Sequence, residues 1–379
     1  MYIRKNLSEN RKTQYNRVFQ RIQTIAGYTP TQLLNLAREE QKPRMADGQI
    51  EFKEIEDRTI TQVQYQLYNH LVQNGLKLST IKSELGIYRA FLREYNIQLP
   101  KNINIRLNQP LYEEGDLPQK QHILQAIQST SNKRNKALFY FMSSSGIRPV
   151  DVRNLKIKDW IKACNYYTEN DDITIQELLD LEYDNFIPCF YFRPQKTSSF
   201  NNVCCTFCTP ESTVAVMEYL KTRHIRSNEE YLFSSRGSDG GQLAQTSFRT
   251  LFQRLNDREF GVNKFGERFF QAKYLRKFFI STCNSHSGDL LKVRLLAGHT
   301  LTDIDRAYNE INLNVMRRFY LKLVPYLSLN DTSVRTVKSK EYSDLERKLK
   351  KQELENRKLQ EEIDDRIDIA IRNVLERYK

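Results

Sequence analysis

The chain reads LLAGHTLTDIDRAY over residues 295–308, which places His299 nine positions before Tyr308. A KYLR box just upstream adds Lys273 and Arg276. An imidazole, a phenol and two cations are therefore expected together in the last part of one basic domain. These are the groups needed to hold a phosphodiester and to attack it with a tyrosine.

A glycine marks the helix end next to which His299 would lie. Gly298 is expected to end one helix, and Thr300 with Asp303 resembles a capping box that starts the next. His299 would then lie at the junction, with Tyr308 about two turns into the new helix.

Another arginine is expected in a rigid elbow between two helices. A helical pattern that begins at Gln119 ends at Gly146, the usual residue just past a helix end. Arg148 follows, then Pro149 at a favourable first helical position and Asp151 in the first turn.

Composition indicates a polyanionic partner. The 379 residues suffice for two or three domains, and 59 Lys and Arg against 46 Asp and Glu give a net charge of +13 and a pI near 9.3. Nucleic acid is the leading candidate. The chain has no run of about 18 apolar residues and no signal-peptide core at its start, so we expect a cytoplasmic, DNA-associated protein without a membrane span.

The chain is expected to be mainly α-helical, with four parts. They are a helical core DNA-binding domain at 8–98, a linker at 99–118, a catalytic domain at 119–330 and a charged C-terminal helix at 338–379. In the first part, Ser79 or Thr80 would cap a helix whose apolar stripe is Ile81, Leu85, Tyr88 and Leu92. A plain helical bundle with solvated basic faces explains this part equally well.

The catalytic domain is expected to hold a small sheet among its helices. Residues 187–193 and 202–207 are β-prone and flank a turn-like segment, which would place Lys196 at the tip of a hairpin. Further helices are expected at 214–221, 247–255, 273–283 and 290–296.

Six cysteines include the pair Cys205 and Cys208, which has the spacing of half a zinc site. No second pair of Cys or His stands at ligand spacing. Ordinary buried thiols are therefore favoured over metal ligands.

The last segment, 338–379, carries an interrupted apolar stripe on a seven-residue frame. This pattern favours a coiled-coil-like helix that docks onto a partner or a neighbouring subunit over a helix that is merely solvated.

Together these motifs resemble the tyrosine recombinase (phage integrase) family. That family's first arginine lies in a Gly-hydrophobic-Arg-x-x-Glu/Asp segment, matched at 146–151, and its second in a His/Lys-x-x-Arg box, matched at 273–276. Its Leu-Gly-His segment, nine residues ahead of the nucleophile, is matched by Ala297-Gly298-His299 and Tyr308. The resemblance covers about 119–325, and the long insert, the Lys-containing box and the tail are more similar to archaeal virus-type integrases than to bacterial Xer proteins.

The resemblance implies a site-specific recombinase or integrase of double-stranded DNA that works as a homo-oligomer, a tetramer on two DNA sites. Tyr308 would attack the scissile phosphate to give a 3′-phosphotyrosyl link. Arg148 and Arg276 would clamp the phosphate, and Asp151 would brace the site. No metal or nucleotide cofactor is expected.

By the same resemblance, Lys196 would protonate the 5′-oxygen that leaves, with Lys156 and Lys158 as competing candidates. His299 and Lys273 would bond the phosphate or assist proton transfer.

Two other functions fit part of this pattern. A type IB topoisomerase would use a similar set of residues and would relax supercoils without exchanging strands. A catalytically silent DNA-binding protein that assembles through its tail would form no covalent adduct with DNA.

Overall fold

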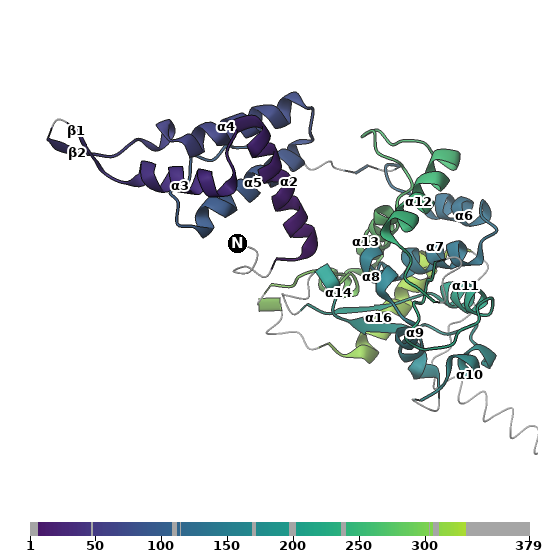
Figure 1. The fold of residues 1–379 in the computed structure, drawn as a ribbon. Coiled ribbons are helices and arrows are strands. Elements are labelled where there is room, and N and C mark those ends of the chain that lie inside the picture. The colour runs from purple at the N-terminus through teal and green to yellow at the C-terminus, as the bar shows by residue number, and fades with distance from the viewer. Residues whose placement is uncertain are drawn as a thin grey trace, which may run out of the picture. The chain divides into compact units, whose positions relative to one another are not determined.

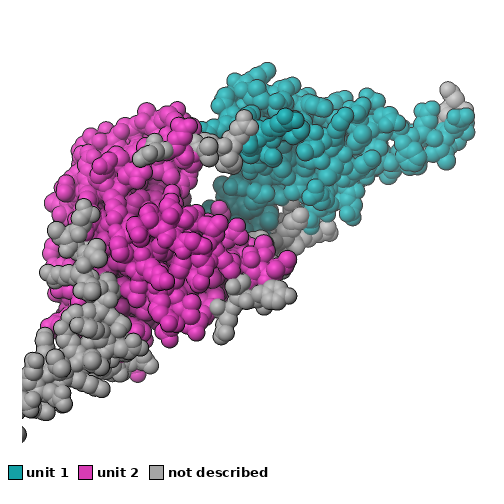
Figure 2. All heavy atoms as spheres, turned by 180° about the vertical axis from the view of Figure 1, so that it is seen from behind, with its two compact units in different colours: residues 1–111 teal, residues 112–379 magenta. Residues whose placement is uncertain are grey.

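The computed structural model divides into two compact units, residues 1–111 and 112–379 (Figure 2). The structure describes residues 7–46, 48–107, 112–113, 115–168, 172–196, 202–235, 240–302, 304–305 and 311–330. Tyr308 and the tail at 338–379 lie outside these described residues. Each unit has hydrophobic core of its own.

Unit 1, residues 1–111, is a helical bundle with one short hairpin (Figure 1). Its elements are α2 (Glu9–Ala26), α3 (Pro30–Gln41), β1 (Arg44–Ala46), β2 (Gln49–Glu51), η1 (Ile55–Asp57), α4 (Thr59–Gln73) and α5 (Leu78–Glu94). Helix α4 packs against α2, α3 and α5, because its apolar face is buried between them.

The amphipathic helix expected near residue 80 is confirmed, but its start is not where the capping residues predicted. The stripe Ile81, Leu85, Tyr88 and Leu92 is buried. Helix α5 begins at Leu78, and Lys77 precedes it without a side-chain capping bond. Ser79 and Thr80 therefore lie inside the first turn, so the predicted cap was wrong.

The first part of the stretch expected to be a linker packs on unit 1. Ile105 is 7% exposed and belongs to the apolar core of this unit. The carbonyls of Lys101 and Ile105 accept hydrogen bonds from Gln64 of α4 and Lys82 of α5, at 2.8 and 3.2 Å. Residues 99–107 are thus fixed to the helices before them.

Unit 2, residues 112–379, is also mainly helical among its described residues, with one antiparallel strand pair. Its helices are α6 (Lys120–Gln128), α7 (Lys133–Ser145), α8 (Pro149–Asn154), α9 (Ile157–Cys164), η2 (Asn165–Tyr167), α10 (Ile175–Asp180), α11 (Pro210–Leu220), α12 (Gln245–Glu259), α13 (Ala272–Ser287), α14 (Leu290–Leu296) and α16 (Leu313–Leu327). Strands β3 (Cys189–Phe192) and β4 (Cys204–Phe207) pair with each other. The expected fold class, mainly α with a small sheet, is confirmed.

Helix α7 is the central element of unit 2, packed against α6, α11 and α13. It ends in three buried serines, Ser143, Ser144 and Ser145, whose hydroxyls donate to carbonyls one turn earlier at 2.8, 2.8 and 2.6 Å. Because these polar groups are satisfied within the helix, its last turn can lie inside the core.

Among the described residues, no helix combines the length and the hydropathy that a membrane span requires.

Candidate active site

Arg148 lies in the elbow that the sequence predicted. Gly146 ends α7 with φ of +62°, and a Cβ at this position would lie 2.2 Å from the ring of Phe279. Arg148 then precedes α8, whose first residue is Pro149. The short turn directs the arginine toward another helix end, where its Nη2 donates to the carbonyl of Gly298 at 2.9 Å.

Arg276, on α13, forms hydrogen bonds with the C-terminal ends of both α7 and α14. It is 9% exposed, and its Nη1 and Nη2 donate to the carbonyls of Gly146 and Ala297, both at 2.5 Å. These bonds use two of its five N–H donors. Burial, together with the charge of Arg148, lowers the pKa of Arg276 to about 10.

A glycine turn presents the carbonyls to the arginines. The amides of His299 and Gly298 donate to the carbonyls of Arg294 and Leu295 at 2.9 and 3.0 Å, the pattern of a Schellman motif. Gly298 has φ of +57°. The carbonyl of Ala297 and that of Gly298 are the arginine acceptors, and His299 follows at once.

His299 is half-buried next to the arginine pair. Burial, followed by the charges of Arg276 and Arg148, lowers the pKa of its imidazole to about 4. The ring is therefore neutral at pH 7, so one of its nitrogens can accept a hydrogen bond and the other can donate one.

Asp151 braces the loop that follows β3. It is 5% exposed, and its Oδ1 accepts a hydrogen bond from the amide of Gln195 at 2.9 Å. Burial raises its pKa, and the Gln195 amide, Arg148 and Arg276 partly offset this effect. Its Oδ2 is buried and has no hydrogen-bond partner among the residues that the structure describes.

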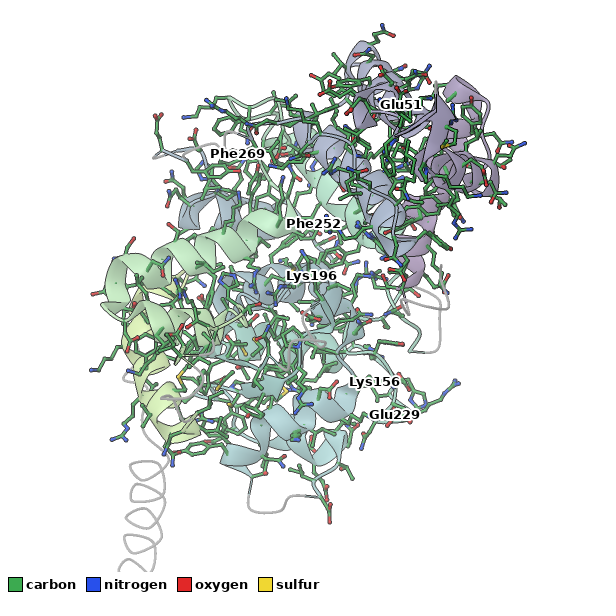
Figure 3. All side chains as sticks on the ribbon, turned by 90° about the vertical axis from the view of Figure 1, so that its left-hand side faces the viewer. Glu51, Lys156, Lys196, Glu229, Phe252 and Phe269 are labelled. Atoms are coloured by element: carbon green, nitrogen blue, oxygen red, sulfur yellow. The ribbon has the colours of Figure 1, made fainter. Side chains whose placement is uncertain are left out.

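Lys196 is exposed and directly follows Gln195 in the connection between β3 and β4. The competing candidates, Lys156 and Lys158, both bind the carboxylate of Glu229, at 2.7 and 2.6 Å. Figure 3 shows Lys156 beside Glu229 and apart from Lys196. Of the three lysines, Lys196 is the one that directly follows Gln195, whose amide donates to Asp151.

Lys273 stands one turn before Arg276 on α13, but its ammonium is engaged elsewhere. It pairs with Glu267 at 2.5 Å and lies 4.7 Å from the ring centroid of Tyr274. The structure thus brings together Arg148, Arg276, His299 and Asp151. Lys273 is instead paired with Glu267.

Cys204 is part of the site, a role that no sequence motif indicated. Its Sγ donates to the carbonyl of Leu296 at 3.2 Å. A Cβ on Gly298 would lie 2.8 Å from the Cβ of Cys204 and 3.1 Å from Pro194. Strand β4 therefore packs directly against the glycine turn. The only signal was the β-prone run itself, in which the cysteines were expected to be ordinary buried thiols.

Cys205 and Cys208, the pair with the spacing of half a zinc site, are buried among apolar residues. Cys205 and Cys208 are both 0% exposed. The part of the chain that the structure describes contains no group of three or more His, Cys, Asp or Glu able to hold a metal ion.

The helix start after His299 differs from the expected one. The reciprocal capping bonds join Thr302 and Asp305, at 3.1 and 3.3 Å. Thr300 instead accepts a hydrogen bond from Asn202 at 3.0 Å. Asp303, the partner proposed for Thr300, lies outside the described residues, as does Tyr308.

The electrostatics of the cluster suit an anion. Two guanidinium groups lie close together, and the Nη1 of Arg148 is buried without a hydrogen-bond partner among the described residues. A buried charged donor is stabilised when it is paired. A phosphodiester oxygen supplies both the charge and the acceptor.

We expect Gly298→Ala to destabilise unit 2 more than Gly288→Ala. Both glycines have positive φ, at +57° and +66°, and only Gly298 would have its Cβ within 3 Å of another atom. The backbone strain costs about 1–2 kcal/mol in each variant, and overpacking against Cys204 adds about 1–3 kcal/mol at Gly298. Urea unfolding of the full chain measures both, and equal losses would mean that the turn and β4 are not tightly packed.

We also expect His299 to make stability depend on pH. Because its pKa falls from 6.5 to about 4 on folding, the unfolded chain binds the extra proton between these values. The contribution of the neutral imidazole to the free energy of unfolding is complete above pH 6.5 and is lost as the pH falls toward 4. In urea unfolding between pH 4 and 7, His299→Asn should flatten the profile relative to the parent chain. Equal slopes for the parent chain and the variant over this range would contradict the burial of His299.

No family model matches the sequence, and no curated protein sequence matches it. The fold is similar to that of the Tn1549 transposon integrase in complex with a circular intermediate DNA, with 14% identity, coverage of 83% of this chain and 94% of that chain, and a TM-score of 0.48. It is also similar to the XerH site-specific recombinase bound to a palindromic difH substrate, with 17% identity, 76% coverage of both chains and a TM-score of 0.46. For the XerA recombinase the identity is 15%, the coverage is 84% of this chain and 93% of that chain, and the TM-score is 0.34. At these identities the similarity assigns no side-chain role.

Proposed function

We propose that this chain is a site-specific DNA recombinase that cleaves and rejoins DNA through a 3′-phosphotyrosyl intermediate. The observation that carries this proposal is the convergence of Arg148 and Arg276 on the carbonyls of Ala297 and Gly298, directly beside His299. The arginines come from two separate elements, Arg148 from the start of α8 and Arg276 from the second turn of α13. From His299 the sequence leads within nine residues to Tyr308.

In the proposed step, the phenolic oxygen of Tyr308 attacks the scissile phosphorus and the bond from phosphorus to the 5′-oxygen breaks. The phenolic proton passes to a base, and Lys196 gives a proton to the leaving 5′-oxygen. Negative charge grows on the non-bridging oxygens during the attack. Arg148 and Arg276 stabilise that charge, because both are held in place before the substrate arrives.

The neutral imidazole of His299 fits either of two tasks in this step. Since its pKa lies near 4, the ring has a lone pair at pH 7 that can receive the phenolic proton, and its N–H can bond a phosphate oxygen. We assign proton transfer or phosphate bonding to His299, and Lys273 would join it by exchanging Glu267 for a phosphate.

The assignment of the general acid to Lys196 is supported by exclusion and by position. Lys156 and Lys158 share one carboxylate, that of Glu229, which they would have to leave. Lys196 follows Gln195, whose amide is bonded to the buried Asp151. Asp151 would thus set the position of the general acid and the first arginine together.

We further infer that the working form is a homo-oligomer, a tetramer on two double-stranded DNA sites. Exchange of strands between two duplexes requires cleavage of four strands, and the net charge of +13 favours binding along the phosphate backbone. The segment 338–379 is our candidate for assembly between subunits.

We expect Tyr308→Phe to bind DNA as the parent does and to form no covalent adduct with a nicked suicide substrate, because the change removes only the attacking oxygen. Tyr326→Phe is the matched control, since Tyr326 is exposed and stacks on His286 at 3.9 Å between ring centroids. Adducts are read as protease-sensitive shifted bands. Adduct formation by the Tyr308 variant would assign the attack to another residue.

We expect Arg148→Ala and Arg276→Ala each to slow cleavage at least about a hundredfold, the scale for loss of one preorganised transition-state donor. DNA affinity should fall far less, because binding is spread over many phosphate contacts. Arg223→Ala is the control for losing a largely covered arginine, since its side chain is 10% exposed and binds Glu230 and two backbone carbonyls away from the cluster. Single-turnover rates and gel-shift affinities separate the effects, and parallel losses of rate and affinity would reduce both arginines to binding residues.

A further inference from the structure

Two thiols of the β3 and β4 pair lie on one face of the ribbon. The register pairs Cys189 with Phe207 and Tyr191 with Cys205. Residues two apart on a strand, and the residues opposite them, point to the same side. Cys189 and Cys205 are therefore diagonal neighbours on a single face, close enough for their side chains to meet.

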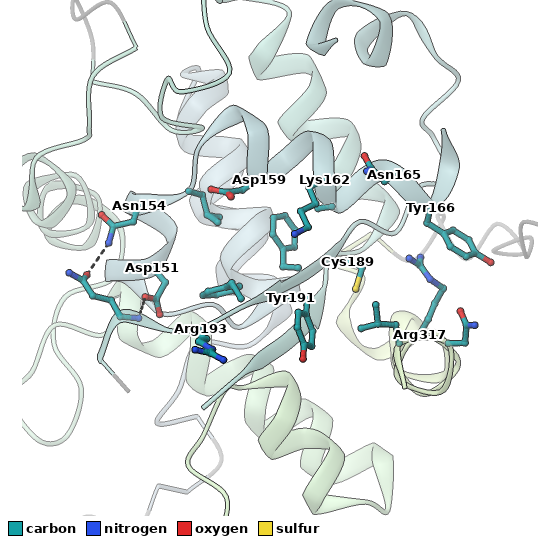
Figure 4. A pocket seen from close by; sticks show the side chains of 17 residues that line it. Asp151, Asn154, Asp159, Lys162, Asn165, Tyr166, Cys189, Tyr191, Arg193 and Arg317 are labelled. Carbon is teal, nitrogen blue, oxygen red and sulfur yellow. Dashed lines mark hydrogen bonds between the residues drawn. The ribbon is translucent and has the colours of Figure 1, made fainter. Parts of the chain in front are cut away.

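The two thiols differ in their access to solvent. Cys189 is half-buried in the wall of a cavity of about 490 Å³, together with Tyr166, Tyr191 and Arg317 (Figure 4). Cys205 is 0% exposed and packs in the apolar cluster beneath the strand. A small reagent can therefore reach Cys189, whereas Cys205 is shielded from solvent.

A fixed cation lies beside this pair. Arg317 donates from its Nη1 to the carbonyl of Ile187 at 2.7 Å, and its guanidinium lies 3.8 Å from the ring centroid of Tyr166. It is 9% exposed, so its charge is weakly screened. Such a charge stabilises a thiolate.

The neighbouring thiols shift each other's pKa. The interaction with the Cys205 thiol lowers the pKa of Cys189, burial opposes this shift and the charge of Arg317 adds to it. The same interaction and burial raise the pKa of Cys205. Burial also raises the pKa of the thiols of Cys164, Cys204, Cys208 and Cys283. Cys189 is thus the thiol most ready to react.

We propose that Cys189 and Cys205 form a reversible redox dithiol that is oxidised by small-molecule disulfides such as oxidised glutathione. The Cys189 thiolate attacks one sulfur of the reagent and displaces a glutathione thiolate, which leaves a mixed disulfide on Cys189. Cys205 then loses its proton to solvent, attacks the Cys189 sulfur and releases the second glutathione. The protein loses two hydrogen atoms and one oxidised glutathione becomes two reduced ones.

Oxidation of the pair would act on β4, the strand that packs against the glycine turn of the arginine site. Cys205 directly follows Cys204, which packs on the glycine turn that presents the arginine acceptors. A disulfide at Cys205 would restrain β4 next to this contact.

The test is treatment of the reduced, full-length protein with oxidised glutathione, followed by intact mass and peptide mapping. We expect the loss of two hydrogen atoms, a peptide that links Cys189 to Cys205, and reversal by dithiothreitol. Cys205→Ala should stop at one glutathione bound to Cys189. Cys189→Ser should show neither product.

Cys283→Ser is the matched control and should react as the parent does, because Cys283 is buried on α13 outside the ribbon. A thiol-alkylating reagent should modify Cys189 at least about tenfold faster than Cys164 or Cys283 in the folded chain. Circular dichroism confirms that each variant is folded. A different disulfide, a second glutathione on the parent chain or equal alkylation rates would overturn the proposal. Because no readout involves DNA, its failure is distinct from failure of the recombinase proposal.

Discussion

Arg276 binds two backbone carbonyls that belong to different helix ends, Gly146 after α7 and Ala297 after α14. The bond to Gly146 joins segments 130 residues apart in the sequence through a buried charge. Carbonyls carry only partial charge, so they satisfy the geometry of the guanidinium without neutralising it. The fold therefore keeps a cation inside the molecule, and the second arginine, the imidazole and the buried carboxylate are arranged around it.

The charge of Arg276 affects the protonation of the side chains next to it. His299 stays neutral because burial and the positive charges of Arg276, Arg148 and Arg294 oppose its protonation. Asp151 is pulled in opposite directions, by burial toward the neutral acid and by the arginines toward the carboxylate. The glycine turn at Gly298 is equally constrained, since β4 leaves no space for a Cβ there. The chemistry of the site and the packing of the ribbon are thus parts of one arrangement.

Local sequence signals predicted the helix ends, because glycine and proline act within a few residues. The elbow from Gly146 to Pro149 and the turn at Gly298 were foreseen for this reason. Contacts between distant segments were not predictable in this way. Nothing near Lys273 identifies Glu267 as its partner, and nothing near Cys204 indicates Gly298. The helix start after His299 had two candidate Thr and Asp pairs at equal spacing, and of these only Thr302 with Asp305 has both members described.

The like charges inside unit 2 also link its folding to the composition of the solvent. Any anion that binds the arginine pair in the folded chain and not in the unfolded one adds to the free energy of unfolding, in proportion to the logarithm of its concentration above its dissociation constant. Arg148 and Arg276 thereby make the stability of this protein a function of which anions surround it. Phosphate or sulfate in a buffer acts on the fold as a ligand, beyond its contribution to ionic strength.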